Sequence, residues 1–148
     1  MITIIIFKMK KVLIINIFMA IALLGVAQKP MTLPIISTKY TADPAPLVYN
    51  DTVFLYTSHD EDDAMGFKML DWLLYYSTDM VNWTEYGAVA SLKDFDWVPY
   101  DNGAWAVQCI ERNGKFYLYC PMPGGVGIGV LVADTPYGPF KDPLGKAL

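Results

Sequence analysis

The sequence predicts an all-β protein that forms part of a β-propeller. Beyond the first 27 residues, short runs rich in Tyr, Phe, Trp, Val and Leu alternate with clusters of Gly, Pro, Asn and Asp. This alternation is typical of short antiparallel strands. Two tight-turn sequences each join two such runs, and the order of strand, turn and aromatic residue then occurs twice along the chain. A repeated unit of this kind is typical of propeller blades.

The two tight turns indicate how the predicted strands pair. Asn113-Gly114 lies between two apolar runs, and Asn-Gly is a strong hairpin signal because both residues tolerate a positive φ. Asn50-Asp51 has the same place, with a weaker signal, between two earlier runs. The predicted strands are, in order, Ala45–Tyr49, Val53–Ser58, Trp72–Ser77, Thr84–Ala90, Trp105–Arg112, Lys115–Pro121 and Ile128–Ala133.

The order of elements that follows each of these hairpins is also repeated. A third apolar strand is followed by a small polar turn and then by an aromatic residue, Trp83 in the first copy and Phe140 in the second. A unit of about 60 residues with four antiparallel strands is a propeller blade. The alternative, part of a β-sandwich, has no reason to repeat this order. The sequence therefore predicts one complete blade and about three strands of a second, fewer than the roughly four to eight blades that close a propeller.

The N-terminus predicts a signal peptide over residues 1–27. Lys10-Lys11 precedes the apolar run Val12 to Val26, and Gly25-Val26-Ala27 offers the small-x-small pattern of a cleavage site. A retained membrane anchor is less favoured, because a spanning helix needs roughly 20 apolar residues. Met9 is the more natural start. We therefore expect a secreted or periplasmic protein with no stable membrane insertion after cleavage.

The charge of the mature chain limits its partners. Removing residues 1–27 takes away three lysines and no acidic residue, so the net charge changes from −4 to −7. Nucleic acid is disfavoured as a partner, because its phosphates need positive contacts. The acidic balance suits a neutral ligand and favours solubility. His59 is the only histidine, which excludes a multi-histidine zinc site within this chain.

Asp43 is the first candidate for chemistry, because it enters the first and innermost predicted strand. It precedes Pro44, and a residue before proline favours extended backbone. We therefore expect an extended Asp43 whose side chain can point into the central channel, where propellers bind ligands. An Asp-Pro turn that only starts the strand is an equally open interpretation.

Nearly the whole mature chain resembles glycoside hydrolase family 43. The motifs that carry the resemblance are Thr41-Ala42-Asp43-Pro44, Val53-Phe54-Leu55-Tyr56-Thr57-Ser58, Ser77-Thr78-Asp79-Met80-Val81-Asn82-Trp83, Trp105-Ala106 and Asn113-Gly114-Lys115-Phe116-Tyr117-Leu118-Tyr119. Val107 departs from the pattern, because the family usually has proline there. The resemblance implies a five-bladed propeller that acts on plant cell-wall sugars, as an inverting α-L-arabinofuranosidase, β-xylosidase or arabinanase.

The resemblance also implies a role for Asp43. It would be the general base, which deprotonates the water that attacks the anomeric carbon, while a separate carboxylic acid protonates the leaving oxygen. The family's pKa-modulating aspartate and general-acid glutamate match nothing up to Leu148. We therefore interpret residues 28–148 as the N-terminal part of the propeller domain and expect this chain to be inactive alone. A non-catalytic carbohydrate-binding propeller fragment is the alternative.

Three further residues are candidates for substrate binding. Trp105 offers an apolar platform for a sugar ring, unless it only fills the core between blades. His59 and Asp60 open an acidic cluster that continues to Asp63, which we interpret mainly as a solvated loop. Hydrogen bonds from these two residues to sugar hydroxyls are the functional alternative. The cluster lacks the glycine and distal glutamate of a calcium loop, so no metal site or cofactor is predicted here, although calcium is possible in the full-length family.

The two cysteines flank the Asn113-Gly114 turn. A two-residue turn makes Cys109 and Cys120 diagonal neighbours on one face of the sheet. Diagonal neighbours are too far apart for a strain-free disulfide. The sequence therefore predicts two buried free thiols, although an exported protein meets an oxidising compartment.

Overall fold

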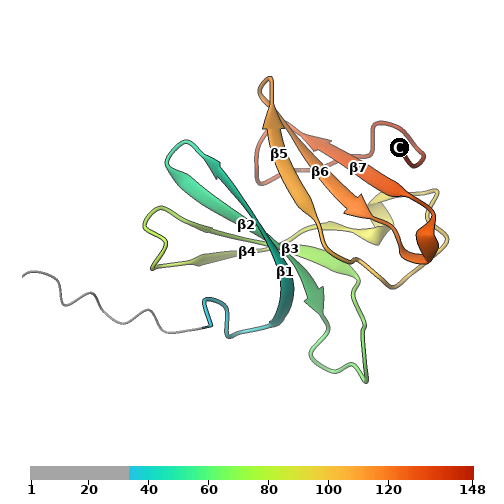
Figure 1. Ribbon diagram of the computed structural model, residues 1–148, viewed down its shortest axis with the longest axis horizontal. Coiled ribbons are helices and arrows are strands. Elements are labelled where there is room, and N and C mark those ends of the chain that lie inside the picture. The colour runs from blue at the N-terminus through green and yellow to red at the C-terminus, as the bar shows by residue number, and fades with distance from the viewer. Residues whose placement is uncertain (1–33) are drawn as a thin grey trace, which may run out of the picture. The chain divides into compact units, whose positions relative to one another are not determined.

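The computed structural model describes residues 34–148, which form two antiparallel sheets (Figure 1). The first sheet has the order β1-β2-β3-β4 and the second the order β5-β6-β7. Within each sheet, every strand pairs with the next one along the chain, as in a propeller blade. The strands are β1 (Tyr40–Tyr49), β2 (Thr52–Asp60), β3 (Asp71–Ser77), β4 (Thr84–Ser91), β5 (Gln108–Arg112), β6 (Lys115–Pro121) and β7 (Ile128–Ala133). The prediction of one four-stranded blade and three strands of a second is confirmed.

The predicted signal peptide, residues 1–27, lies outside the described residues. Its cleavage and the resulting export therefore stay predictions. Within residues 34–148, none of the helices has the length and apolar character needed to cross a membrane.

Both predicted tight turns are present. All four residues of Asn50-Asp51 and Asn113-Gly114 have positive φ, between 46° and 74°. Two consecutive positive φ values are the geometry of a type I′ turn, whose twist matches that of the flanking strands. The turns close the β1-β2 and β5-β6 hairpins in the register that the sequence predicts.

Two strands begin three or more residues away from their predicted starts, and the other boundaries agree within two residues. β1 begins at Tyr40 rather than at Ala45, because its first residues also pair with the end of β2. β5 begins at Gln108 rather than at Trp105, because the preceding backbone is bonded to the loop before β3 instead. The amides of Gly103 and Ala104 both donate to the Met69 carbonyl at 2.9 Å. The segment before β5 is therefore held by the loop that precedes β3.

One apolar core lies between the two sheets. Its fully buried side chains include Tyr56 and Trp72 from the first sheet and Phe116 and Leu118 from the second. Burying such a side chain stabilises the fold by about 1.5–3 kcal/mol. The Tyr56 hydroxyl also donates to the Pro136 carbonyl at 2.6 Å, which satisfies a buried polar group and ties β2 to the segment after β7.

The opposite face of the first sheet carries a second, smaller cluster. Leu55, Leu73 and Tyr75 are buried there, with Ile36 and Trp83 packed against them. Burial raises the pKa of the Tyr75 hydroxyl to about 12. Within residues 34–148, the Tyr75 hydroxyl and the Trp83 Nε1 are both buried and have no hydrogen-bond partner. A sheet with two apolar faces is typical of a propeller blade, which packs against a neighbour on each side.

The prediction of two buried free thiols is confirmed. Cys109 and Cys120 are both reduced and almost fully buried. Cys109 pairs with Leu118 across the β5-β6 ladder, as the two-residue turn requires. Burial raises the pKa of Cys109 to about 11 and that of Cys120 well above its ordinary value.

This burial predicts that both thiols react slowly in the native protein. The thiolate is the reactive species, and the raised pKa values keep Cys109 and Cys120 protonated near neutral pH. We expect Ellman's reagent at about pH 8 to modify neither thiol quickly, although an unperturbed thiol, with a pKa of about 8.5, reacts readily there. Both should react once guanidinium chloride is added. A native protein whose thiols react as fast as the denatured one would contradict the burial.

Candidate functional site

The candidate site lies at one end of the first sheet, where β1 and β3 begin and β2 and β4 end. The register places Ala42 beside Ser58, Ser58 beside Trp72, and Trp72 beside Ala90. We call this end of the sheet, residues 40–43, 58–60, 71–72 and 90–91, the Asp43 edge. Antiparallel pairing makes polar residues from four separate parts of the sequence neighbours here.

Asp43 occupies a β-bulge in β1. The register shifts between Ala42 and Ala45, and Asp43 has a φ of 50°. The prediction of an extended backbone at Asp43 is therefore wrong. A bulge re-aims a side chain, and aspartate enters the left-handed region more readily than most residues. Asp43 has this conformation inside a strand, whereas Asn50, Asp51, Met80 and Asn113 have it in turns between strands.

The Asp43 carboxylate is exposed and has one close polar neighbour. Ser58 Oγ lies 3.3 Å from Asp43 Oδ2 and 3.0 Å from the Ala42 carbonyl oxygen, so its single proton is shared between two acceptors. Among the other aspartates of the edge, Asp71 bonds His59 and Asp60 accepts the Lys68 amide. Asp43 and Asp60 therefore each keep one carboxylate oxygen without a hydrogen bond, and the role of Asp43 as general base stays a prediction.

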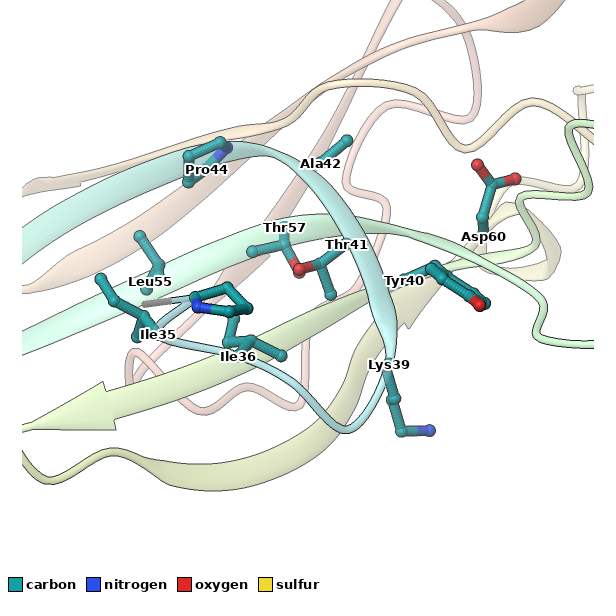
Figure 2. A pocket seen from close by; sticks show the side chains of 11 residues that line it. Ile35, Ile36, Lys39, Tyr40, Thr41, Ala42, Pro44, Leu55, Thr57 and Asp60 are labelled. Atoms are coloured by element: carbon teal, nitrogen blue, oxygen red, sulfur yellow. The ribbon is translucent and has the colours of Figure 1, made fainter. Parts of the chain in front are cut away.

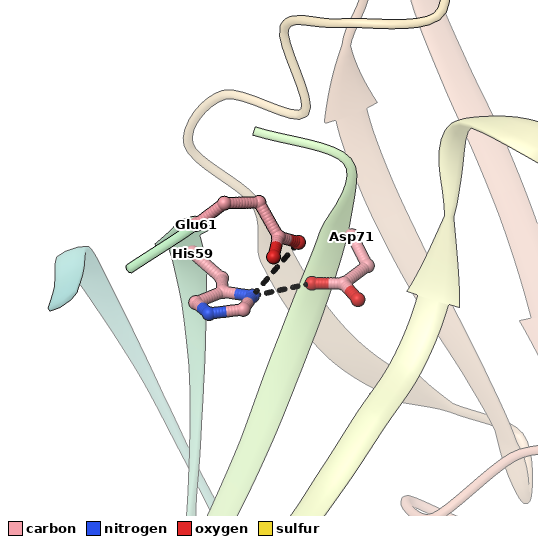
Figure 3. A group of neighbouring side chains, drawn as sticks. All are labelled: His59, Glu61 and Asp71. Atoms are coloured by element: carbon pink, nitrogen blue, oxygen red, sulfur yellow. Dashed lines mark hydrogen bonds and ion pairs between the residues drawn. The ribbon is translucent and has the colours of Figure 1, made fainter. Parts of the chain in front are cut away.

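His59 is buried at the end of β2, so the interpretation of this residue as part of a solvated loop is wrong. Its side chain is 7% exposed. Figure 3 shows the His59 ring facing two carboxylates, with Nδ1 2.9 Å from Asp71 Oδ1 and 3.9 Å from Glu61 Oε1. The His59–Asp71 contact joins the neighbouring ends of β2 and β3. Only Nε2 of His59 is left for a contact with a sugar hydroxyl.

His59, Glu61 and Asp71 also form a group that could hold a metal ion. Their ligand atoms all lie within 4.8 Å of one another. The sequence signal for this group of possible metal ligands was weak, because Asp71 is separated from His59 and Glu61 by the loop that precedes β3. The expectation that this chain holds no metal stays a prediction.

Asp60 lies at one wall of a cavity of about 410 Å³ on the β1-β2 side of the sheet. Figure 2 shows Ile35, Leu55, Thr41 and Thr57 among the side chains that line this cavity. Asp60 pairs with Tyr40, three residues before Asp43, so it does lie near the predicted base. One of its oxygens accepts the Lys68 amide at 3.0 Å, which holds the loop before β3 and leaves the other oxygen for a ligand.

Trp105 is partly exposed and lies outside β5. The residue is 38% exposed, which argues against a role as core filler alone. Its carbonyl oxygen accepts a hydrogen bond from Trp72 Nε1 at 2.6 Å, so the first sheet fixes its backbone. Its ring meets that of Phe67 edge to face, with centroids 6.0 Å apart. The role of Trp105 as a sugar platform stays a prediction.

Sequence reasoning missed Phe67 and Asn102. Phe67 is 71% exposed and extends the aromatic surface of Trp105. Asn102 holds the loop that carries Phe67, because its Oδ1 accepts the Met69 amide at 2.7 Å and its Nδ2 donates to the Phe67 carbonyl at 3.0 Å. The loop that carries Phe67 has neither an alternation of apolar and polar residues nor a turn motif that would have predicted these contacts.

Comparison with known proteins identifies relatives of this arrangement. Residues 31–148 match the profile of Glycosyl hydrolases family 43. The chain is 39% identical over 138 residues to an arabinoxylan arabinofuranohydrolase from Paenibacillus polymyxa, a match that covers 78% of this chain and 21% of that protein. The chain therefore spans about a fifth of this relative's length.

Two solved structures show the same fold. An α-L-arabinofuranosidase from Clostridium thermocellum is 43% identical, with a TM-score of 0.62 over 78% of this chain and 38% of that one. A β-xylosidase/α-arabinofuranosidase of family 43 from a compost metagenome is 31% identical, with a TM-score of 0.66 over 76% of this chain and 37% of that one. With a profile match over most of its length and two sheets arranged as successive blades, the chain belongs to glycosyl hydrolases family 43 and forms part of a β-propeller.

Proposed function

We propose that the protein carrying this chain is an exported, inverting glycoside hydrolase that releases arabinose or xylose from plant polysaccharides. The family supports glycoside hydrolysis. The names of the relatives support the sugars, since one is an arabinoxylan arabinofuranohydrolase and another, from Humicola insolens, a xylosidase/arabinosidase. A family 43 enzyme from Xanthomonas citri binds xylotriose. The observation that carries the proposal is the exposed, left-handed Asp43 at the start of β1.

In this proposal Asp43 acts as the general base. Its carboxylate takes a proton from a water molecule, and the water oxygen attacks the anomeric carbon on the face opposite the leaving group. The Ser58 hydroxyl, 3.3 Å from Asp43 Oδ2, helps to orient the carboxylate. Trp105 and Phe67 offer an apolar surface for a sugar ring, and Asp60 offers a free carboxylate oxygen for a sugar hydroxyl.

The proposal needs a second carboxyl group. An inverting site holds its general acid about 6.5–9.5 Å from the base, with a raised pKa so that the acid stays protonated at working pH. No residue up to Leu148 matches the family's general acid. We place this acid in sequence that follows Leu148 in the complete protein.

Export is proposed on the character of residues 1–27. Their positive start, apolar run and small-x-small end support secretion, or transfer to the periplasm, with removal of the segment. An exported enzyme meets polysaccharides that do not enter cells. The mature net charge of −7 suits such a neutral polymer and offers no patch for nucleic acid.

This proposal predicts that the 148-residue chain alone releases no arabinose or xylose. One carboxylate cannot serve as both base and acid in an inverting site. Protein translated from the complete reading frame, extended past Leu148, is expected to release one of these sugars from arabinoxylan or from a nitrophenyl glycoside. Chromatography of the released monosaccharides measures both preparations.

Comparing the 148-residue chain with the extended protein tests the missing carboxyl group and the proposed activity separately. Turnover by the 148-residue chain would contradict the need for a second carboxyl group from elsewhere. An extended protein that releases neither sugar would overturn the proposed activity. If that protein still bound xylo-oligosaccharides, the exposed pair Trp105 and Phe67 would favour the alternative function, non-catalytic carbohydrate binding.

A further inference from the structure

A second cavity lies on the far side of the first sheet from β1 and has no part in the proposed reaction. Its volume is about 610 Å³. Its walls come from the loop before β3, the end of β4, the short helix η1 (Leu92–Asp94) and the segment that follows it. We call it the β4 cavity. The side chains that give it polar or exposed aromatic groups are Lys68, Asp71, Ser91, Lys93, Tyr100 and Asp101.

The β4 cavity opens at the same end of the sheet as Asp43. Two of its lining residues, Asp71 and Ser91, belong to the Asp43 edge and pair with each other across β3 and β4. Neighbouring strands lie about 4.8 Å apart, so β3 and β4 lie about 10–15 Å from β1. An oligosaccharide of several units spans this distance. A polymer bound at Asp43 could therefore extend into the β4 cavity.

Tyr100 gives the cavity a fixed aromatic wall. A Cβ atom on Gly124 would collide with the ring and hydroxyl of Tyr100, so this ring rests directly on the backbone of η2 (Pro123–Gly125). Gly124 has a φ of 66°, which also favours glycine there. Tyr100 is still 43% exposed. A ring that is held in place but accessible loses little conformational entropy when a ligand covers it.

The chemistry of the lining fits a neutral ligand rich in hydroxyl groups. The lining holds two positive and two negative side chains: Lys93 can donate hydrogen bonds and Asp101 can accept them. Lys68 Nζ lies 3.5 Å from Asp63, and Asp71 contacts His59. Apolar walls with a few placed polar groups are typical of small-molecule sites. A sugar offers both an apolar ring face and many hydroxyls. Balanced charges do not favour a polyanion.

We propose that the β4 cavity is a distal carbohydrate subsite, which binds a neutral sugar unit of the polysaccharide chain that is cleaved at Asp43. The class of ligand rests on the proposed function, whereas the place of the subsite rests on the cavity itself. Tyr100 presents its ring to the sugar, and Lys93 and Asp101 bond its hydroxyls. Asp71, which lines this subsite, also contacts His59 at 2.9 Å and so connects the subsite to the rest of the Asp43 edge.

Length-dependent binding tests this proposal. The protein from the complete reading frame, with Asp43→Asn to prevent turnover, is titrated with xylobiose and with xylohexaose by calorimetry. We expect xylohexaose to bind about tenfold more tightly, which corresponds to about 1.4 kcal/mol. Tyr100→Ala and Lys93→Ala should each remove most of this gain and leave the affinity for xylobiose unchanged.

Lys146→Ala is the matched control, because Lys146 is exposed and lies outside the β4 cavity. It should leave both affinities unchanged, and thermal unfolding of each variant checks its fold. The exposed Lys93 keeps the test valid if Tyr100→Ala fails to fold. Equal affinity for the two oligosaccharides would overturn the subsite, as would a gain that survives both substitutions in the cavity.

A separate measurement keeps the subsite distinct from the proposed function. A nitrophenyl arabinofuranoside or xyloside occupies only the reacting end of the site, so its hydrolysis does not depend on the β4 cavity. Loss of length dependence with normal hydrolysis of these glycosides would overturn the subsite alone. Failure to hydrolyse them, with length-dependent binding intact, would overturn the proposed function alone.

Discussion

Replacing Asp43 by asparagine is expected to lower kcat for arabinose or xylose release by about 10²–10⁴, the usual contribution of a general base. Asparagine has nearly the same size and also tolerates the left-handed backbone, so the bulge at φ 50° should persist. What is lost is the negative charge that accepts the proton of the attacking water. The measurement is kcat on arabinoxylan and on a nitrophenyl glycoside, with protein from the complete reading frame.

Asp51→Asn is a matched control for Asp43→Asn. Asp51 also has a left-handed backbone, with a φ of 56°, but it lies in the β1-β2 turn at the other end of the sheet. Its substitution makes the same chemical change without touching the proposed site, so kcat should stay the same. If both variants kept the parent kcat, Asp43 would not be the general base and the proposed mechanism would be wrong.

The blades were predictable from the sequence because their signals are local. A positive-φ pair at Asn113-Gly114 allows one hairpin register, and that register fixes which residues share a face. The pairing of Cys109 with Leu118, and the position of both cysteines on one face of the sheet, followed from the turn alone. The repeat of strand, turn and aromatic residue then gave the two-blade arrangement.

The geometry at Asp43 was not predictable in this way. The proline rule concerns a clash within the chain between neighbouring residues and favours extended backbone before Pro44. The bulge depends instead on how β1 pairs with β2, where Ala42 meets Ser58 and Ala45 meets Tyr56. Between these pairs Asp43 and Pro44 of β1 lie opposite the single residue Thr57 of β2, and the one extra residue forms the bulge at Asp43. A contact between distant segments thus overrode a local preference.

Burial of His59 has a similar cause. A run of charged residues usually indicates a solvated loop, and this holds for Asp62 and Asp63, which are exposed. β2 continues to Asp60, however, because its last residues still pair with β1. This extension carries His59 to the start of β3, where Asp71 lies 12 positions further along the chain and offers its carboxylate. The charge of Asp71 could not be linked to His59 without the course of the intervening loop.

The largest effect on stability is expected from Trp72→Ala, which should lower the free energy of unfolding by about 3–5 kcal/mol. Trp72 is completely buried, and its ring packs edge to face against Phe95 with centroids 6.5 Å apart. Domains are usually stable by only about 5–15 kcal/mol, so the loss would be a large fraction of the total. Urea titration followed by far-UV circular dichroism measures it without relying on tryptophan fluorescence.

The variant Trp72→Phe distinguishes two roles of Trp72, its packing in the core and its hydrogen bond to the Trp105 backbone. Phenylalanine keeps most of the buried ring but removes the Nε1 donor that reaches the Trp105 carbonyl at 2.6 Å. The expected loss of stability is smaller, about 1–3 kcal/mol for the unpaired polar group. If Trp105 is the sugar platform, this variant should also bind xylo-oligosaccharides more weakly, because the Trp105 backbone loses its anchor. A stable Trp72→Phe protein with unchanged affinity would show that sugar binding does not need this anchor of the Trp105 backbone.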